Sequence, residues 1–345
     1  MKILHIADVH LGVKINKLPK DKSALMKDEM IFEFNNLFEN ANSFDIILIC
    51  GDLFNSKQVS MKLLKSFYDA VKSFGKPVLY VEGNHDEKFI FDESKPSNFI
   101  VLNNSYNCFT LNGVNFYCDS DIEKLNKEET NVLLLHGNID NSIDRDYVDI
   151  NQYAQLGFNY IALGHIHQFQ KRKISDTLTA YSGSLFSCGF DECGDKGYIS
   201  VDIDENKQVT AEFVPFAKRR FIICQCDITG FGINNDVIKA INLKFEANDV
   251  KKEDIIRVVL KGRVLEDNNI SVPFIKNYFE DYFYIEIENQ TTLEIDFDKI
   301  KSEKLSFKYE FINLVENSEL SEDEKNAVCR IGIEALKGED LSIWN

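Results

Sequence analysis

Five short motifs carry five of the chain's six histidines together with aspartate, asparagine or glycine, and each motif closes a run of apolar residues. In chain order the motifs are Asp8-Val9-His10, Gly51-Asp52, Gly83-Asn84-His85-Asp86, His136-Gly137 and Gly164-His165-Ile166-His167. Imidazole nitrogens, carboxylates and an amide oxygen are the ligands that two neighbouring divalent cations need. Such a pair hydrolyses phosphate esters by activating a water and neutralising the charge that builds on phosphorus.

The spacing of these residues suggests how the cations would be held. Asp8 and His10 are two apart at a strand end, where alternate side chains share a face, so both can reach one ion. Asp52 can bridge both ions, because Gly51 lets the backbone come close. The remaining candidate ligands are Asn84, His136, His165 and His167. This mixed set suits manganese, favoured here, or iron or zinc rather than calcium. Two cations within about 4 Å repel, so a bridging carboxylate and a bridging hydroxide are needed.

His85 is predicted to be a general acid rather than a ligand. Once phosphorus has been attacked, the departing oxygen must take up a proton, and a histidine without a metal can donate it near neutral pH. Asp86 either orients the His85 ring or fixes the loop, and the sequence leaves both readings open. His5 lies inside the first strand and is interpreted as a structural residue.

Apolar strands alternate with amphipathic helices over the first part of the chain, which indicates an α/β layered core. The motifs fall at the C-terminal ends of strands, where open α/β sheets present their ligands. The expected strands cover 2–7, 45–50, 77–82, 114–117, 131–135, 160–163 and 200–203, and the expected helices cover 25–41 and 57–74.

A second, α+β pattern begins near residue 218, and charged helical segments follow residue 291. The expected domains are therefore 1–217, 218–290 and 291–345. The expected elements are strands at 221–227, 255–261 and 283–288 and helices at 236–248 and 272–279. Two further helices carry apolar stripes at Phe307, Phe311, Leu314 and Val315 and at Val328, Ile331, Ala335 and Leu336, the second opened by a capping box from Ser321 to Glu324. These stripes either pack against the body or dock a partner, and Trp344 is either folded back or an anchor.

The net charge of −17 opposes nucleic-acid binding, because affinity for a phosphate backbone comes mainly from Lys and Arg. A polyanionic substrate must then be held by local positive charge. Candidate clusters are Lys14, Lys17, Lys20 and Lys22, then 171–173, and then 218–220. No segment approaches the ~20 apolar residues that span a bilayer, and the eight cysteines contain no C-x-x-C pair. We expect a soluble, cytoplasmic protein that has no membrane partner.

In this order the motifs resemble those of the calcineurin-like metallophosphoesterase superfamily. Segments 4–12, 51–54, 181–185, 189–192 and 196–198 further resemble DNA repair exonucleases of the SbcD and YhaO type. The resemblance covers about the first 215 residues, and the remainder matches only in layout. It implies a β-sandwich flanked by helices, with a small capping domain and C-terminal helices after it. It also implies one metal on Asp8, His10, Asp52 and His167 and a second on Asp52, Asn84, His136 and His165.

The resemblance further implies a DNA nuclease that uses a two-metal-activated hydroxide, an exonuclease with endonuclease action left open. Its C-terminal helices would dock onto a coiled-coil ATPase of the SbcC or YhaN kind, and a homodimer is a further expected assembly. A basic ATPase would resolve the mismatch between the negative charge and a DNA substrate. The alternatives are a phosphodiesterase or phosphatase for small nucleotides or phosphoproteins, and a scaffold that has lost its metals. The full ligand set argues against the scaffold.

Overall fold

The computed structural model describes residues 1–118, 125, 126, 128–265, 268–294, 300, 302 and 306–336. The chain forms two compact units, Met1–Ile222 and Ile223–Asn345, which are described separately. The three predicted domains stay a prediction. Trp344 lies outside the described residues.

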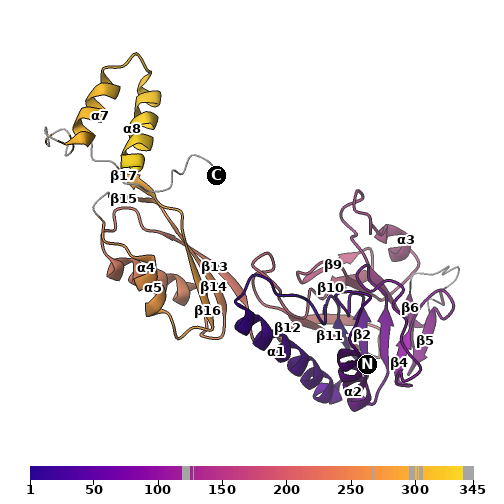
Figure 1. Cartoon of the computed structure of the whole chain (residues 1–345). Coiled ribbons are helices and arrows are strands. Elements are labelled where there is room, and N and C mark those ends of the chain that lie inside the picture. Colours follow the sequence, from indigo (N-terminus) through magenta and orange to yellow (C-terminus); the bar gives the residue numbers. More distant parts are fainter. Residues whose placement is uncertain are drawn as a thin grey trace. The chain divides into compact units, whose positions relative to one another are not determined.

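The first unit is built on two mixed six-stranded sheets (Figure 1). One sheet has β1 at its centre, and β1 to β4 are parallel. On the other side of β1 two more strands follow, each antiparallel to the strand beside it. Its order is β12 (Val209–Pro215), β11 (Gly197–Ile203), β1 (Lys2–Ile6), β2 (Ile46–Cys50), β3 (Val78–Val81) and β4 (Phe99–Val101).

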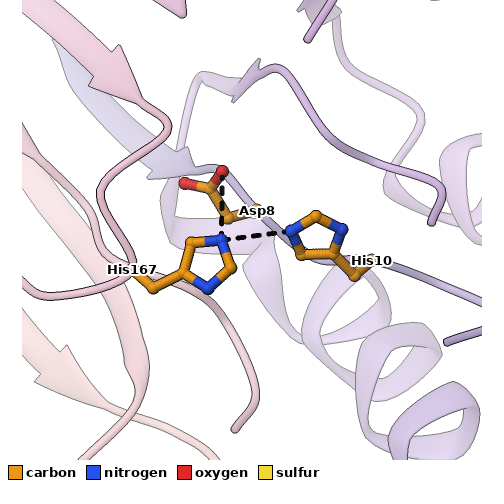
Figure 2. Close-up of side chains that lie close together, drawn as sticks. All are labelled: Asp8, His10 and His167. Carbon is orange, nitrogen blue, oxygen red and sulfur yellow. Dashed lines mark hydrogen bonds and ion pairs between the residues drawn. The ribbon is translucent and has the colours of Figure 1, made fainter. Parts of the chain in front are cut away.

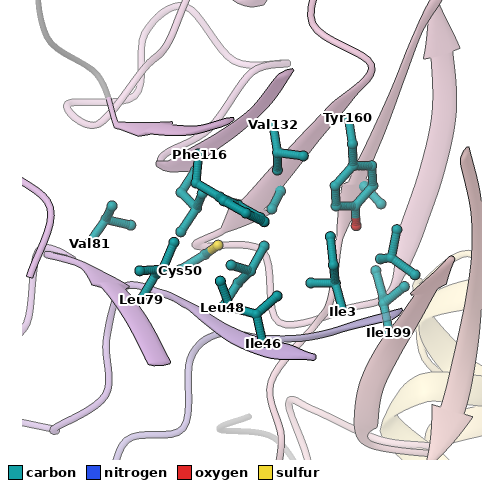
Figure 3. Close-up of a cluster of buried hydrophobic side chains, with 14 of the residues drawn as sticks. Ile3, Ile46, Leu48, Cys50, Leu79, Val81, Phe116, Val132, Tyr160 and Ile199 are labelled. Carbon is teal, nitrogen blue, oxygen red and sulfur yellow. The ribbon is translucent and has the colours of Figure 1, made fainter. Parts of the chain in front are cut away.

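The second sheet also combines a parallel centre with antiparallel edge strands. Its order is β5 (Cys108–Leu111), β6 (Val114–Cys118), β7 (Thr130–His136), β8 (Tyr160–Gly164), β10 (Thr177–Tyr181) and β9 (Gln170–Ile174). Figure 3 shows the core between the sheets, where Ile46 and Leu48 of β2 face Phe116 and Val132 of the other sheet. The predicted sandwich is confirmed.

Helices cover the outer faces of both sheets. The helices of this unit are α1 (Lys20–Glu39), the short 3-10 helix η1 (Ala41–Ser43), α2 (Met61–Phe74) and α3 (Ile150–Ala154). Phe67 of α2 lies edge-on to Phe99 of β4 with ring centroids 5.0 Å apart, and Ile150 of α3 packs with Leu133 and Ile161. The prediction that α2 begins at residue 57 is wrong, because Ser60 caps the helix by accepting from the amide of Leu63.

His5 is completely buried, and its Nδ1 lies 2.9 Å from the Tyr160 hydroxyl of the facing sheet. Burial lowers the pKa of His5 from 6.5 to about 3. Between these pH values the unfolded chain binds a proton that the folded chain does not, so the free energy of unfolding falls as the pH falls below 6.5. Above 6.5 both states are neutral and the effect vanishes.

We therefore expect the fold to lose less stability in acid once His5 is replaced by leucine. At about pH 7 the His5→Leu variant should have a lower free energy of unfolding than the wild type, because the Tyr160 hydroxyl loses its hydrogen-bond partner. The drop in the free energy of unfolding between about pH 7 and pH 4.5 should nevertheless be smaller in the variant, by about 2 kcal/mol. Urea titrations at both pH values measure this difference, and equal drops in both proteins would contradict it.

The first part of the second unit, up to residue 294, contains a three-stranded sheet, two helices and a two-stranded ribbon in the described residues. The sheet is β13 (Phe221–Asp227), β14 (Ile255–Lys261) and β16 (Tyr284–Asn289), with β14 and β16 parallel. The helices are α4 (Asn234–Ala247) and α5 (Val272–Tyr278), and the ribbon is β15 (Arg263–Leu265) with β17 (Thr292–Glu294). The elements predicted for this stretch are confirmed, and the ribbon was not predicted.

Two further helices, α7 (Phe307–Glu316) and α8 (Glu322–Leu336), pack against each other. The predicted capping box is confirmed, since the Ser321 amide donates to the Glu324 carboxylate at 2.9 Å. The predicted stripes are confirmed at Phe311 and Val315, which pack in this cluster, and wrong at four other positions. The buried residues are Ile312, Val315, Cys329 and Ile333, whereas Phe307 is 89% and Leu314 is 72% exposed and both Val328 and Ala335 are exposed. Phe311 packs on Gly332 of α8, where a Cβ would collide with the ring.

Over the described residues, no helix has both the length and the apolar character needed to cross a bilayer.

Candidate metal centre

The first two motifs lie just beyond the ends of β1 and β2 and are tied together by their backbones. The amide of Asp8 donates to the carbonyl of Gly51, and the amide of His10 donates to that of Asp52 at 2.9 Å. Asp8, His10 and Asp52 all have φ near +50°, a conformation that costs non-glycine residues free energy. Strand alternation therefore does not explain how Asp8 and His10 meet. The left-handed backbone turns both side chains to one place.

Glycines allow the ends of β2, β7 and β8 to come close to one another. A Cβ at Gly51 would collide with the His136 ring, and a Cβ at Gly164 would collide with the carbonyl oxygen of Cys50. His136 uses this proximity, because its Nδ1 donates to the Cys50 carbonyl at 2.9 Å. Its Nε2 is then the lone-pair nitrogen, the form in which imidazole binds a metal.

Asp8, His10 and His167 form the first group of ligand atoms, all within 4.8 Å of one another (Figure 2). The Nε2 atoms of His10 and His167 are 3.2 Å apart, and His167 Nε2 lies 3.8 Å from an Asp8 carboxylate oxygen. The other ring nitrogen of His167 donates to Glu192 at 2.5 Å. The Nε2 lone pair of His167 therefore points to the place where its two neighbours converge.

Asp52 links this group to a second one. Its Oδ2 lies 3.8 Å from His10 Nε2 and 3.6 Å from His136 Nε2, while its Oδ1 accepts the His85 amide at 2.8 Å. Asn84 joins from the third motif, with Oδ1 3.0 Å from His136 Nε2. One carboxylate oxygen thus stands between ligand atoms of both groups, which is the position that a bridging ligand requires.

His165 is positioned differently from the other predicted ligands. Its backbone amide donates to both carboxylate oxygens of Asp8, at 3.1 and 3.0 Å. Its ring lies edge-on to His136, with centroids 5.3 Å apart, but Nε2 faces Asp144 at 3.5 Å. The structure brings the other six predicted ligands together through direct contacts and gives the His165 ring an acidic partner that the sequence did not indicate.

The donor set fits divalent cations. Asp8 and Asp52 are 1% and 2% exposed, and burying carboxylates is costly unless positive charge lies beside them. Burial raises the pKa of Asp8, because desolvation disfavours its charged form. Burial also lowers the pKa of His10 to about 4, so this ring is neutral and can bind a metal near neutral pH. Cations held by these residues would compensate the buried negative charge.

His85 sits at the edge of this cluster and is exposed. Its ring centroid is 4.9 Å from that of His10, and its Nδ1 lies 3.4 Å from the carbonyl oxygen of Asn55. Of the two roles that the sequence left open for Asp86, the contacts favour the structural one. Its carboxylate accepts from the amides of Gly83 and Phe54, at 2.9 and 3.2 Å, so it fixes the loop that carries Asn84 and His85.

Two residues that support the centre had no predicted role. Glu192 holds His167, and its second carboxylate oxygen accepts the Cys188 amide at 3.1 Å. Lys196 is 6% exposed and donates to the His167 carbonyl at 2.5 Å. Burial lowers the pKa of Lys196, and the charge of Glu192 opposes this effect. The only sequence signal was their place in segments that resemble a known family.

We expect Glu192→Gln to weaken metal binding by about 10- to 100-fold, because a carboxylate that holds a metal-binding histidine makes the ring a better ligand. Calorimetric titration with manganese measures the affinity. Asp191→Asn is the matched control, since Asp191 is the neighbouring carboxylate but pairs with Lys17 at 2.7 Å. Equal affinities in the Glu192 variant and the wild type, or an equal loss in the control, would contradict the assignment.

The chain is similar in sequence to a family of phosphoesterases and to DNA repair proteins and nucleases. Residues 1–169, which include all five motifs, match the calcineurin-like phosphoesterase family. The chain is 28% identical over 236 residues to the DNA double-strand break repair protein Mre11 of Methanocaldococcus jannaschii, covering 60% of this chain and 63% of that protein. It is 22% identical over 363 aligned positions to an SbcCD nuclease subunit of Staphylococcus epidermidis, covering 89% of this chain and 95% of that protein.

A third relative is the metallophosphoesterase YhaO of Bacillus subtilis, 25% identical over 244 residues, with 62% of this chain and 60% of that protein covered. The matches to the Methanocaldococcus and Bacillus proteins thus span less than two thirds of those relatives' lengths. The Staphylococcus match extends over nearly the whole of both chains.

Proposed function

Residues 1–169 are a calcineurin-like phosphoesterase domain, from a family of phosphoric ester hydrolases, and from this premise we propose that the chain is a metal-dependent DNA nuclease. The observation that carries the proposal is the position of Asp52 Oδ2 between His10 and His136, at 3.8 and 3.6 Å. Relatives named as DNA repair proteins and nucleases support DNA as the substrate.

Each group of residues would have its own role in the reaction. Two divalent cations, for which we propose manganese, would when bound supply charge to the phosphate oxygens and acidify a water molecule. Asp52 would hold the two ligand groups in register. His85 would donate a proton from Nε2 to the departing oxygen, since its Nδ1 faces the Asn55 carbonyl. The exposed position of His85 leaves room for a substrate beside it.

We further propose that helices α7 and α8 dock onto a coiled-coil ATPase. Phe307 and Leu314 support this, because they are large apolar side chains left 89% and 72% exposed. Co-purification of the full-length chain with the ATPase encoded in the same genome tests it. Phe307→Ala with Leu314→Ala should weaken the complex, whereas Phe274→Ala, a 55% exposed phenylalanine of α5, should not. A homodimer and a cytoplasmic location complete the proposal.

A small nucleotide or a phosphoprotein is the second candidate substrate, favoured by the net charge of −17. Assays with manganese that compare a single-stranded oligonucleotide with bis(p-nitrophenyl) phosphate distinguish the two. We expect a much larger kcat/KM for the oligonucleotide. Hydrolysis of the small diester without any cleavage of DNA would overturn the nuclease proposal.

A further inference from the structure

A polar cavity of about 510 Å³ opens beside the ligands Asn84 and His136. Two basic residues, Lys57 and Arg145, line it together with three acidic residues, Glu82, Glu87 and Asp146. Its volume lies in the range of sites that bind small molecules, about 300 to 1,000 Å³. The cavity therefore places two cationic residues in the same space as the ligands Asn84 and His136, within a lining that also carries acidic groups.

Several cations of the basic clusters singled out in the sequence are already paired with carboxylates. Arg172 pairs with Asp140 at 2.7 Å, and Lys17 pairs with Asp191 at 2.7 Å. Arg219 is only 8% exposed and is bound to Glu29. These three residues are therefore engaged within the protein, whereas Lys57 and Arg145 line the cavity beside the metal ligands.

The position of Lys57 is set by the segment that follows Asp52 in the chain. The amide of Leu11 donates to the Leu53 carbonyl at 2.9 Å, and the amide of Asn55 donates back to the Leu11 carbonyl at 3.2 Å. These bonds fix the segment against the first motif. Because α2 begins only at Met61, Lys57 lies in the loop before it and lines the cavity.

Arg145 is placed by a turn that packs on the fourth motif. A Cβ at Gly137 would collide with the carbonyl oxygen of Asp146, and the Asn138 amide donates to this same oxygen at 2.9 Å. The Asp144 carboxylate holds the turn through the Asp146 amide and the Asn138 side chain, both at 3.0 Å. The exposed Arg145 between these two aspartates is thereby held next to His136.

Glu87 is the anion that these cations face in the absence of substrate. Its carboxylate lies 3.9 Å from Lys57 Nζ and 2.9 Å from Lys88 Nζ. The hydrogen bond from Lys88 lowers the pKa of Glu87 most, and the charges of Lys57 and Arg145 lower it further. A ligand anion can replace Glu87 at Lys57 and Arg145, because Lys88 remains as the partner of Glu87.

We propose that this cavity is a subsite for the phosphate next to the scissile one, bound by Lys57 and Arg145. Arginine binds phosphate through paired hydrogen bonds, and lysine binds it as a point charge. The inference rests on the proposed nuclease function and gives it a substrate class. The preferred substrate is a polynucleotide with a flanking phosphate rather than an isolated phosphodiester.

The test compares two full-length variants, Lys57→Gln and Arg145→Gln, with the wild type on two substrates. We expect kcat/KM for a single-stranded oligonucleotide to fall about tenfold more than kcat/KM for bis(p-nitrophenyl) phosphate, which has no flanking phosphate. Lys72→Gln is the matched control, because it removes the same charge from an exposed position of α2 outside the cavity. It should leave both rates unchanged.

Binding without turnover gives a second readout. In EDTA, fluorescence anisotropy with a labelled oligonucleotide should show a weaker affinity for each cavity variant. The slope of log Kd against log salt should also decrease by roughly one in each variant, because one fewer phosphate contact releases fewer counterions. The Lys72 control should keep the wild-type slope.

The outcomes separate this inference from the proposed function. If the wild type cleaves the oligonucleotide but both cavity variants match Lys72→Gln, the subsite is wrong and the nuclease stands. Equal losses on both substrates would also overturn the subsite, because the two residues would then serve the metal centre itself. If the wild type hydrolyses only the small diester, the nuclease proposal fails and the subsite fails with it.

Discussion

Asp52→Asn should lower kcat/KM for phosphodiester hydrolysis by at least about a thousandfold. The carboxylate is 2% exposed, and its Oδ2 stands between His10 and His136. An amide in its place carries no negative charge to offset two mutually repelling cations, so the second ion should be lost. Metal-assisted charge stabilisation is worth several kcal/mol, and each 1.4 kcal/mol is about a factor of ten in rate.

The substitution is chosen to keep the fold. Asparagine retains an oxygen that can accept the His85 amide, as Asp52 Oδ1 does at 2.8 Å. Metal analysis of the purified variant should find fewer ions per chain than in the wild type, with an unchanged circular dichroism spectrum. Asp69→Asn, an exposed aspartate of α2 paired with Lys65, is the control. Full metal content and activity in the Asp52 variant would contradict the bridging position.

His85→Ala should lower kcat by about a hundredfold to ten-thousandfold while leaving metal binding intact, as expected for a general acid. The ring is exposed at the edge of the cluster and shares no hydrogen bond with a predicted ligand's side chain in the described structure. Metal titration and steady-state kinetics on the same preparation separate the two effects.

The leaving group provides an internal control for this role. A nitrophenolate leaves without taking up a proton, so the loss caused by His85→Ala should be much smaller on bis(p-nitrophenyl) phosphate than on DNA. Equal losses on both substrates would exclude proton donation, and loss of metal would make His85 a ligand instead.

The strands that lead into the five motifs could be predicted, together with the motif positions, because buried parallel strands appear in sequence as apolar runs. Ile46–Cys50 is such a run, and Asp52 follows it directly. The resemblance of the first part of the chain to calcineurin-like phosphoesterases is confirmed. By contrast, β9 consists of Gln170–Ile174, a charged and exposed edge strand without an apolar pattern, and it was missed.

The supporting contacts of the site could not be predicted, because they join residues far apart in the sequence. Glu192 is 25 positions from His167, and nothing in the local pattern of either residue indicates the pairing. The contact between Asp144 and the His165 ring depends in turn on the packing of the 144–146 turn against Gly137. Such contacts follow from the tertiary structure rather than from spacing.

The negative charge of the whole chain and a DNA substrate are compatible if the positive charge is local. Long-range repulsion between exposed charges is screened beyond roughly 10 Å at moderate salt, whereas a direct phosphate contact is not. Lys57 and Arg145, which line one cavity with His136, would provide such contacts in the proposed subsite. The net charge of −17 should then make DNA binding strongly dependent on these two residues.

We propose that two adjacent cations are bound by Asp8, His10, Asp52, Asn84, His136, His165 and His167. Anomalous X-ray scattering from crystals of the full chain soaked in manganese tests it most directly. We expect two peaks about 4 Å apart or less, flanking the Asp52 carboxylate, with the His165 ring turned from Asp144 toward one of them. No peak among these side chains, or peaks only elsewhere on the surface, would contradict it.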